Sequence, residues 1–329
     1  MPLLSTLLSA TNYANPFLRT LVPSVGLAFG IQGAVAIPSI LAQSERFYDL
    51  SGSLTYLSCT ALSLFLPAIR ARHAAAALGA PKPSFPSLLA GLSGHGGPLG
   101  FNWRQVVLST AVSIWATRLG SYLFARILAD GEDSRFKSIR DSPPKFFGAF
   151  MAQATWVSLC LMPVLAINSL PASTFAALGT TVGITDVIGL LLYVGGLSFE
   201  VTADRQKNAW VQEKKQKKHD EDFLTRGLWS KSRHPNYFGE STLWTGIATT
   251  VAGVLVSNAG TAGMGLAAAG VGAKALALLT AGVSPAFVTF LLLKVSGVPM
   301  SEKKYDEKYG DREQYKKWKR ETPMFIPKL

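Results

Sequence analysis

Cysteine, histidine and acidic residues are all scarce in this chain of 329 residues. The two cysteines, Cys59 and Cys160, lie inside apolar runs, so we expect buried thiols and no disulfide framework. The four histidines include no pair at metal-ligand spacing, so no metal site is expected. No Gly-x-Gly-x-x-Gly fingerprint follows a predicted strand, which argues against a Rossmann domain.

Charge is low overall and is gathered into a few segments. Charged residues make up 16% of the chain, whereas soluble domains carry about a quarter. The net charge of +12 would suggest nucleic acid as a partner of a soluble protein. Here the excess of lysine and arginine in cytoplasmic loops of membrane proteins explains it more simply, so no nucleic-acid partner is expected.

Long apolar runs predict an all-α, polytopic transmembrane bundle of about seven helices. Crossing the hydrocarbon layer takes about 20 mostly apolar residues. The predicted spans are Leu21–Leu41, Ser51–Ile69, Val106–Leu128, Phe150–Ile167, Val182–Phe199, Thr242–Val256 and Lys274–Lys294. The proline-rich insert Ala77–Gly100 cannot form a span. The stretch Ser257–Gly272 reads as a loop or a loose helix end, and an eighth helix there stays open.

Three basic segments set the predicted orientation. Arg135–Lys145, Arg205–Arg233 and Lys303–Lys328 are each separated from the next by two spans, so they share one face of the membrane. The positive-inside rule makes that face cytoplasmic. We therefore expect the N-terminus outside, the C-terminus in the cytoplasm, and a single membrane domain over residues 1–329, with an N-terminal segment 1–20, the insert 77–100 and a basic tail 301–329.

The segment Met1–Thr20 lacks the basic start and compact apolar core of a cleavable signal peptide. It has no acidic residue and is rich in serine and threonine, which leaves a mitochondrial membrane as an alternative to the endoplasmic reticulum that we expect.

Ionisable residues inside predicted spans mark candidate sites, because they are costly in hydrocarbon. Arg118, Tyr122 and Arg126 lie on one helical face, with Trp115 one turn earlier. The two arginines need carboxylates, phosphates or backbone carbonyls as partners. The alternative is a salt-bridge cluster at the helix end with the charged stretch Gly131–Phe136 that follows.

A second polar face ends the fifth predicted span. Glu200, Asp204 and Lys207 share this face. The two carboxylates could hold a ribose or an arginine, or Asp204 could simply pair with Lys207 three residues on.

The sharpest local signal is Gly227–Glu240, in which Pro235 starts a helix after Arg233 and His234. Free N–H groups, the helix dipole and a guanidinium converge there, which is typical of an anion site. Asn236 and Glu240 share a face of that helix. A boundary turn, with Glu240 as an N-terminal cap, is the alternative. The tail after it, with Glu302, three tyrosines and Trp318 among lysines, could bind anionic headgroups or fold over a cofactor.

An ordered series of motifs resembles the steroid 5-alpha-reductase C-terminal-domain-like membrane proteins, in particular their large uncharacterised branch. The matching pieces cover most of residues 43–329: Glu45–Asp49 with Ser51–Tyr56, Trp115–Leu119 with Tyr122 and Arg126, Gly131–Phe136, Glu200 with Ala203–Lys207, Ser232–Glu240 with Trp244, and Ser296–Pro299 with Glu302 and Thr322–Pro327.

This resemblance implies a seven-helix, NADPH-dependent reductase of an activated C=C bond in a lipid-soluble substrate. It implies that Asn236 and Glu240 contact the nicotinamide end, that Asp204 helps to hold the cofactor, and that the tail lies against the nucleotide. Glu45 and Tyr48 would be groups on the substrate side. The N-terminal half departs from the steroid enzymes, so the resemblance does not extend to a steroid substrate.

Two other functions remain open at this point. Arg-His-Pro-x-Tyr at a helix start is also found in membrane methyltransferases of the isoprenylcysteine and phospholipid type, which use S-adenosylmethionine. A membrane protein that kept the fold and lost the chemistry is the third hypothesis.

Arg118 and Arg126 favour a dinucleotide as the cofactor. The further candidates for cofactor binding are Arg233, Tyr237, Asn236, Glu240 and Asp204. Tyr122, Tyr48 and Glu45 are the candidate proton donors to the substrate, and membrane lipids are the expected surroundings.

Overall fold

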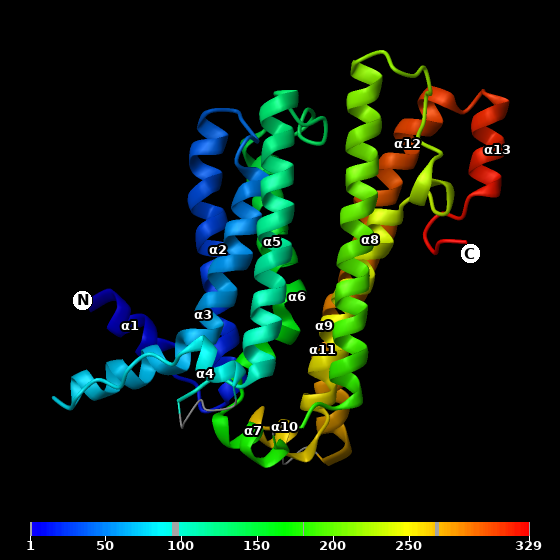
Figure 1. Cartoon of the computed structure of the whole chain (residues 1–329). Helices are drawn as coiled ribbons and strands as arrows, with labels where there is room; N and C mark the ends of the chain where they lie inside the picture. Colours follow the sequence, from blue (N-terminus) through cyan, green and yellow to red (C-terminus); the bar gives the residue numbers. More distant parts are fainter. Residues whose placement is uncertain (1, 94–98, 180, 267–269, 329) are drawn as a thin grey trace. The chain divides into compact units, whose positions relative to one another are not determined.

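The computed structural model describes residues 2–93, 99–179, 181–266 and 270–328, and these residues form helices and loops without a strand. The helices are α1 (Pro2–Ala10), α2 (Pro16–Leu41), α3 (Tyr48–Ala77), α4 (Leu88–Leu92), α5 (Trp103–Asp130), α6 (Pro143–Ser169), α7 (Ala172–Leu178), α8 (Ile184–Lys215), the 3₁₀ turn η1 (Gly227–Ser230), α9 (Pro235–Leu255), α10 (Asn258–Gly263), α11 (Gly270–Phe290), the π-helical turn η3 (Leu291–Val295), α12 (Gly297–Tyr309) and α13 (Glu313–Glu321) (Figure 1).

Each of the seven predicted spans coincides with one long helix, so the prediction of an all-α polytopic membrane protein is confirmed. Within the described ranges, α2, α3, α6, α8 and the continuous stretch Gly270–Tyr309 are long and apolar enough to cross a membrane. The other two, α5 and α9, have 28 and 21 residues. Which face is cytoplasmic stays a prediction.

Capping residues place several helix ends outside the apolar runs. Asn15 precedes Pro16 at the start of α2, and its side chain accepts a hydrogen bond from the Leu18 N–H. Asn102 and Gln105 form a reciprocal capping box at the start of α5. Gly131, with φ of 82°, ends α5 in a conformation that glycine adopts without strain.

The two irregular segments contain only short helices where the structure describes them. The insert 77–100 holds α4, five residues long, and its residues 94–98 lie outside the described part. The stretch 257–272 holds α10, six residues long, before α11 begins at Gly270, with residues 267–269 likewise undescribed.

The chain gathers into two compact units. Unit 1 comprises residues 1–182 and 251–283, and unit 2 comprises residues 183–250 and 284–329. Each unit is therefore built from two stretches of the sequence. The prediction of one domain over the whole chain stays a prediction.

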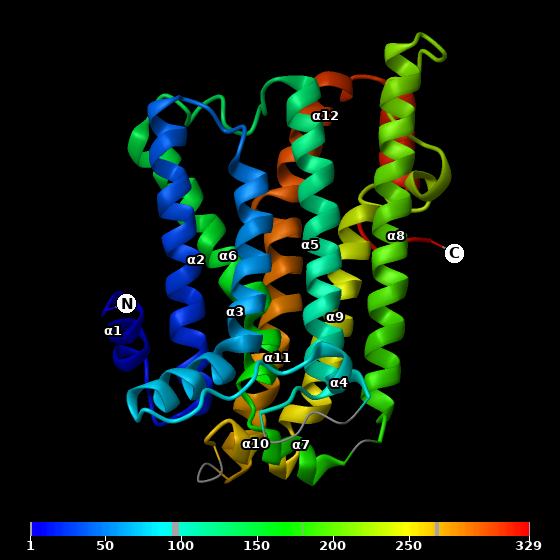
Figure 2. The same ribbon diagram turned by 60° about the vertical axis from the view of Figure 1, so that its left-hand side comes forward.

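In unit 1, α2, α3, α5 and α6 lie side by side (Figures 1 and 2). Tyr56 and Trp115 are buried between them with their rings edge to face, 5.0 Å apart. Buried polar groups also bond from helix to helix: Gln32 donates to Thr55 over 2.8 Å, and Asn168 donates to hydroxyls of α3 and α5. Such bonds satisfy polar groups that hydrocarbon could not.

In unit 2, α8 and α9 run antiparallel with their backbones in close approach. A Cβ on Gly196 would stand 2.5 Å from the Leu243 nitrogen, and one on Gly239 would stand 2.6 Å from the Glu200 nitrogen. Gly189 and Gly246 repeat this contact two turns further along. Small residues at a helix interface permit this spacing, which is common between membrane helices.

We predict that Gly196→Ala lowers the thermal unfolding temperature in detergent, because its new methyl group meets backbone atoms, which side-chain rotation cannot relieve. Overpacking of this kind costs about 1–3 kcal/mol. Gly195→Ala is the matched control, since a Cβ there meets nothing within 4 Å. It should leave stability unchanged or raise it through helix propensity, and equal effects of the two variants would contradict the packing described.

Candidate functional site

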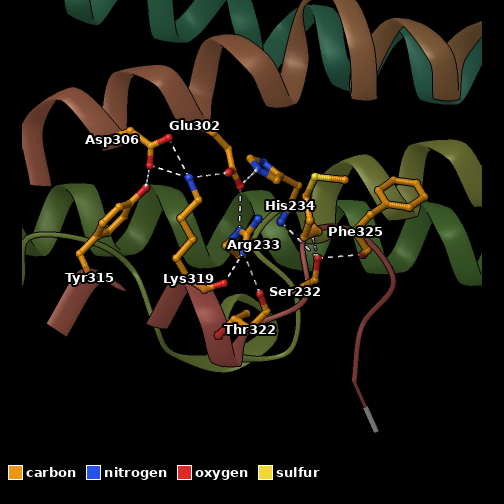
Figure 3. A network of polar contacts seen from close by, with 10 residues as sticks. Ser232, Arg233, His234, Glu302, Asp306, Tyr315, Lys319, Thr322 and Phe325 are labelled. Carbon is orange, nitrogen blue, oxygen red and sulfur yellow. Dashed lines mark hydrogen bonds and ion pairs between the residues drawn. The ribbon is translucent and has the colours of Figure 1, made fainter. Parts of the chain in front are cut away.

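The start of α9 is held to the C-terminal tail by Arg233. Its Nε donates to Glu302 Oε1 over 2.7 Å, and its Nη1 donates to the carbonyl oxygens of Lys319 and Thr322 (Figure 3). The arginine and glutamate side chains are only 11% and 17% exposed. The guanidinium predicted to receive an anionic ligand is thus bound by a carboxylate of the chain itself.

Glu302, on α12, joins three basic side chains. Besides Arg233, its carboxylate contacts His234 Nε2 at 3.2 Å and Lys319 Nζ at 3.1 Å. Lys319 also bridges to Asp306, which accepts a hydrogen bond from the Tyr315 hydroxyl (Figure 3). This arrangement connects α12 and α13 to the loop before α9 by charge-assisted bonds, the strongest class of hydrogen bond in proteins.

Backbone contacts continue the attachment beyond α13. The Arg233 N–H donates to the Pro323 carbonyl over 2.9 Å, and the Ser232 hydroxyl donates to the Phe325 carbonyl over 2.8 Å. The Lys328 N–H donates to the Lys231 carbonyl. We call residues 319–328, fixed in this way, the strap.

His234 is buried beneath this network, and its ring lies parallel to that of Tyr237 with centroids 5.4 Å apart. Burial lowers the pKa of His234, and the positive charges of Lys207 and Arg233 act in the same direction, while the bond to Glu302 opposes them. The imidazole is therefore neutral at pH 7, able to donate from one ring nitrogen and accept at the other.

An aromatic cavity lies beside the network. Its lining includes Trp210 and Lys207 of α8, Trp229 of η1, Tyr305 of α12 and Trp318 of α13. The free space is about 30 Å³, which is room for no more than a few water molecules. Tyr315 and Trp318 of α13 thus help to close a cavity whose wall combines aromatic rings with basic side chains.

Polar groups extend from this cavity along the interior of unit 2. Glu200 and Asp204 of α8 are buried, at 3% and 7% exposure. Gly239 of α9 packs on the Glu200 backbone, so Asn236, one turn earlier on α9, comes level with Asp204. The Oδ1 atom of Asn236 is buried and has no hydrogen-bond partner, as are the hydroxyls of Ser241 and Ser284.

The family model described as protein of unknown function (DUF1295) matches residues 98–262 and 261–322. The chain belongs to the DUF1295 family. No curated protein and no solved structure is significantly similar to it. Within unit 2, the matched ranges contain α9, α12 and α13 and hence the whole ion-pair network, whereas Glu45 and Tyr48 lie outside them.

The remaining candidates of this DUF1295 chain lie in unit 1, and most of them form hydrogen bonds or ion pairs with other residues of this unit. Glu45 accepts hydrogen bonds from Arg140 and from the Asp133 N–H, both over 2.7 Å. The Tyr48 hydroxyl donates to the Ala149 carbonyl over 3.0 Å. Arg126 lies 3.4 Å from Asp133 and is 42% exposed. This is the salt-bridge cluster that the sequence left open as the alternative for this helix end.

Arg118 and Tyr122 of α5 lie one turn apart, with the guanidinium 5.8 Å from the centre of the tyrosine ring. Arg118 also lines an apolar cavity of about 570 Å³ in unit 1, together with residues of α3, α4 and α5. Among the unit 1 candidates, Arg118 therefore lines a space large enough for a lipid-sized ligand.

The structure therefore brings Arg233, Tyr237, Asn236, Glu240 and Asp204 into one unit, and it places Glu45, Tyr48, Arg118, Tyr122 and Arg126 in the other. The sequence pattern pointed to Glu302 but not to its pairing with Arg233. It gave no sign that Lys319 and Asp306 belong to the ion-pair network or that Trp229 lines the cavity. An acidic residue in the charged tail, next to the Ser296–Pro299 motif, was the available signal for Glu302.

We predict that Arg233→Ala frees the strap and exposes the tail to trypsin. Removing one partner of a buried ion pair costs about 3–5 kcal/mol, and cleavage follows the population of the opened form. Cleavage within residues 303–328, followed by mass spectrometry, should become at least about tenfold faster.

Arg226→Ala is the control, because it also removes one trypsin site and one arginine, but from exposed pairs with Glu213 and Glu221. If both variants were cut at the wild-type rate, Arg233 would not be what holds the strap.

Proposed function

We propose that this chain is a membrane-embedded, NADPH-dependent reductase of a C=C bond in a lipid-soluble substrate. The ordered motifs that resemble steroid 5-alpha-reductase-like proteins support this proposal, and so does the polar interior of unit 2. The single observation that carries it is the buried, unpartnered Oδ1 of Asn236, at the level of α9 that faces Asp204 of α8 by the register of the two helices. A buried polar atom without a partner costs about 1–3 kcal/mol, which a ligand donor would recover.

The residues of unit 2 fit such a cofactor in chemical type. Asn236 Oδ1 accepts from an amide or hydroxyl donor, and Glu240 lies one turn away on the same face. Asp204 and Glu200 suit ribose hydroxyls. Lys207 and His234 suit phosphate oxygens, while the aromatic lining suits a stacked base. A bound nicotinamide would supply the hydride.

The chain itself would position the ligand and exclude water. With only about 30 Å³ free in the aromatic cavity, a nucleotide needs the strap and α13 to move away and close again over it. The Arg233–Glu302 ion pair would then hold the strap in its closed position. Arg233 would thus contribute to ligand binding indirectly, by stabilising the closed form. Closure of this kind is a frequent way to shield a reacting centre.

In unit 1, we infer Tyr122 as the proton donor, because Arg118, one turn away on α5, lines a lipid-sized cavity. The contacts of Glu45 with Arg140 and of Tyr48 with Ala149 favour structural roles for these two residues. Arg126 is occupied by Asp133 and Asp49 in the same way.

The methyltransferase alternative keeps one observation in its favour, the Arg233-His234-Pro235 start of α9, which both chemistries use. Thermal unfolding in detergent separates them. NADPH and NADP⁺ should raise the unfolding temperature, with about 2.7 kcal/mol of stabilisation at a hundredfold excess over the dissociation constant. Stabilisation by S-adenosylmethionine and S-adenosylhomocysteine alone would replace the reductase by a methyltransferase, and indifference to all four would favour a protein without this chemistry.

We predict that Asn236→Leu removes most of the NADPH stabilisation and leaves the unliganded protein as stable as the wild type or more so, because it deletes a buried unsatisfied group. Asn208→Leu is the control, since Asn208 is exposed on α8. Equal NADPH binding by Asn236→Leu and the wild type would remove the main support for the proposed site.

A further inference from the structure

A cavity of about 550 Å³ lies in unit 1, at the end of the unit where α2 begins and α3 and α6 end. Its apolar wall includes Leu8 of α1, Pro16 of α2, Leu64 of α3, Phe101 and Leu170. Figures 1 and 2 show α1 and the last turns of α3 close to the first turns of α2. Pro67 lies inside α3 just before these last turns, at a position where a helix can bend.

Two arginines line this cavity. Arg70 donates through Nη1 to the Leu8 carbonyl and through Nη2 to the Thr11 carbonyl, at 2.6 and 2.9 Å. Its Nε is buried without a hydrogen-bond partner. Arg19 donates through Nε to the Tyr13 carbonyl over 2.7 Å. Backbone carbonyls therefore orient both guanidiniums but do not neutralise them.

No carboxylate of unit 1 is available for these charges. The acidic residues of unit 1 lie in the connection from α2 to α3, in the connection from α5 to α6, or in the helix turns next to these connections. They therefore gather at the end of the bundle opposite the cavity. They are Glu45, Asp49, Asp130, Glu132, Asp133 and Asp141. Within the described residues, neither Arg19 nor Arg70 forms an ion pair. Cations without counter-ions at the edge of an apolar cavity attract anions.

The predicted orientation makes these cations more notable. With the N-terminus outside, Arg19 and Arg70 stand on the non-cytoplasmic face, where membrane proteins carry few basic residues. A polar group deeper in the lining also lacks a partner: Asn168 is 1% exposed, its amide donates to Ser63 and Ser109, and its buried Oδ1 accepts nothing.

We propose that this cavity binds an anionic amphiphile, with its phosphate or carboxylate head on Arg19 and Arg70 and its hydrocarbon chain along the apolar wall. A head that also carries a hydroxyl, such as a glycerol ester, would give Asn168 Oδ1 its missing donor. The site lies wholly in unit 1, and it does not rest on the cofactor site proposed for unit 2.

The test is native mass spectrometry of the full chain released from detergent micelles, titrated with dioleoyl phosphatidic acid, oleate, dioleoyl phosphatidylcholine or inorganic phosphate. We expect phosphatidic acid or oleate to bind at least about tenfold more tightly than phosphatidylcholine, and their ranking identifies the head. Arg19→Gln should abolish that preference. Arg70→Lys, which keeps the charge but loses the fork-shaped donor, should weaken it.

Arg72→Gln is the matched control, because Arg72 is two residues from Arg70, contacts Pro83 and Phe85, and does not line the cavity. It should retain the preference. Circular dichroism of each variant confirms that it is folded before it is compared. Equal binding of phosphatidic acid and phosphatidylcholine, equal losses in Arg19→Gln and Arg72→Gln, or inorganic phosphate binding as tightly as the lipids would overturn the proposal.

Discussion

The pairing of Arg233 with Glu302 is the interaction on which the arrangement of unit 2 depends. It joins the loop before α9 to α12, and through the carbonyls of Lys319 and Thr322 it also fixes the end of α13. If this ion pair were broken, the unbalanced positive charge of the tail would lie beside His234 and Lys207. Because Glu302 contacts two cations, Arg233 and Lys319, together with the ring of His234, it orders a basic tail that would otherwise repel the basic loop it covers.

A second constraint, the cost of polar groups away from water, explains where the candidate site lies. Gly196 and Gly239 bring α8 and α9 so close that Glu200 and Asp204 are enclosed rather than exposed to lipid. Close packing thus creates the polar interior that supports the proposed cofactor site. In unit 1 the same constraint is met by ion pairs, since Glu45 pairs with Arg140 and Asp49 pairs with Arg135.

The helices were predictable because length and apolarity are local properties. Their ends were less so: α8 continues to Lys215, far beyond the predicted end at Phe199, since the buried face with Glu200, Asp204 and Trp210 keeps the helical period after the apolar run stops. The helix start at Pro235 and the importance of Arg233 were also visible locally. The partner of Arg233 was not, because Glu302 is 69 residues away and only tertiary packing selects it from the acidic residues of the tail.

We have proposed that the polar interior of unit 2 holds a nicotinamide dinucleotide under the strap. Native mass spectrometry of protein purified in mild detergent without added nucleotide tests it most directly, since a ligand enclosed by α13 should survive purification. We expect release of a species with the mass of NADP⁺ or NADPH on activation, in wild type but not in Asn236→Leu. Release of S-adenosylmethionine or S-adenosylhomocysteine instead, from the same site, would contradict it.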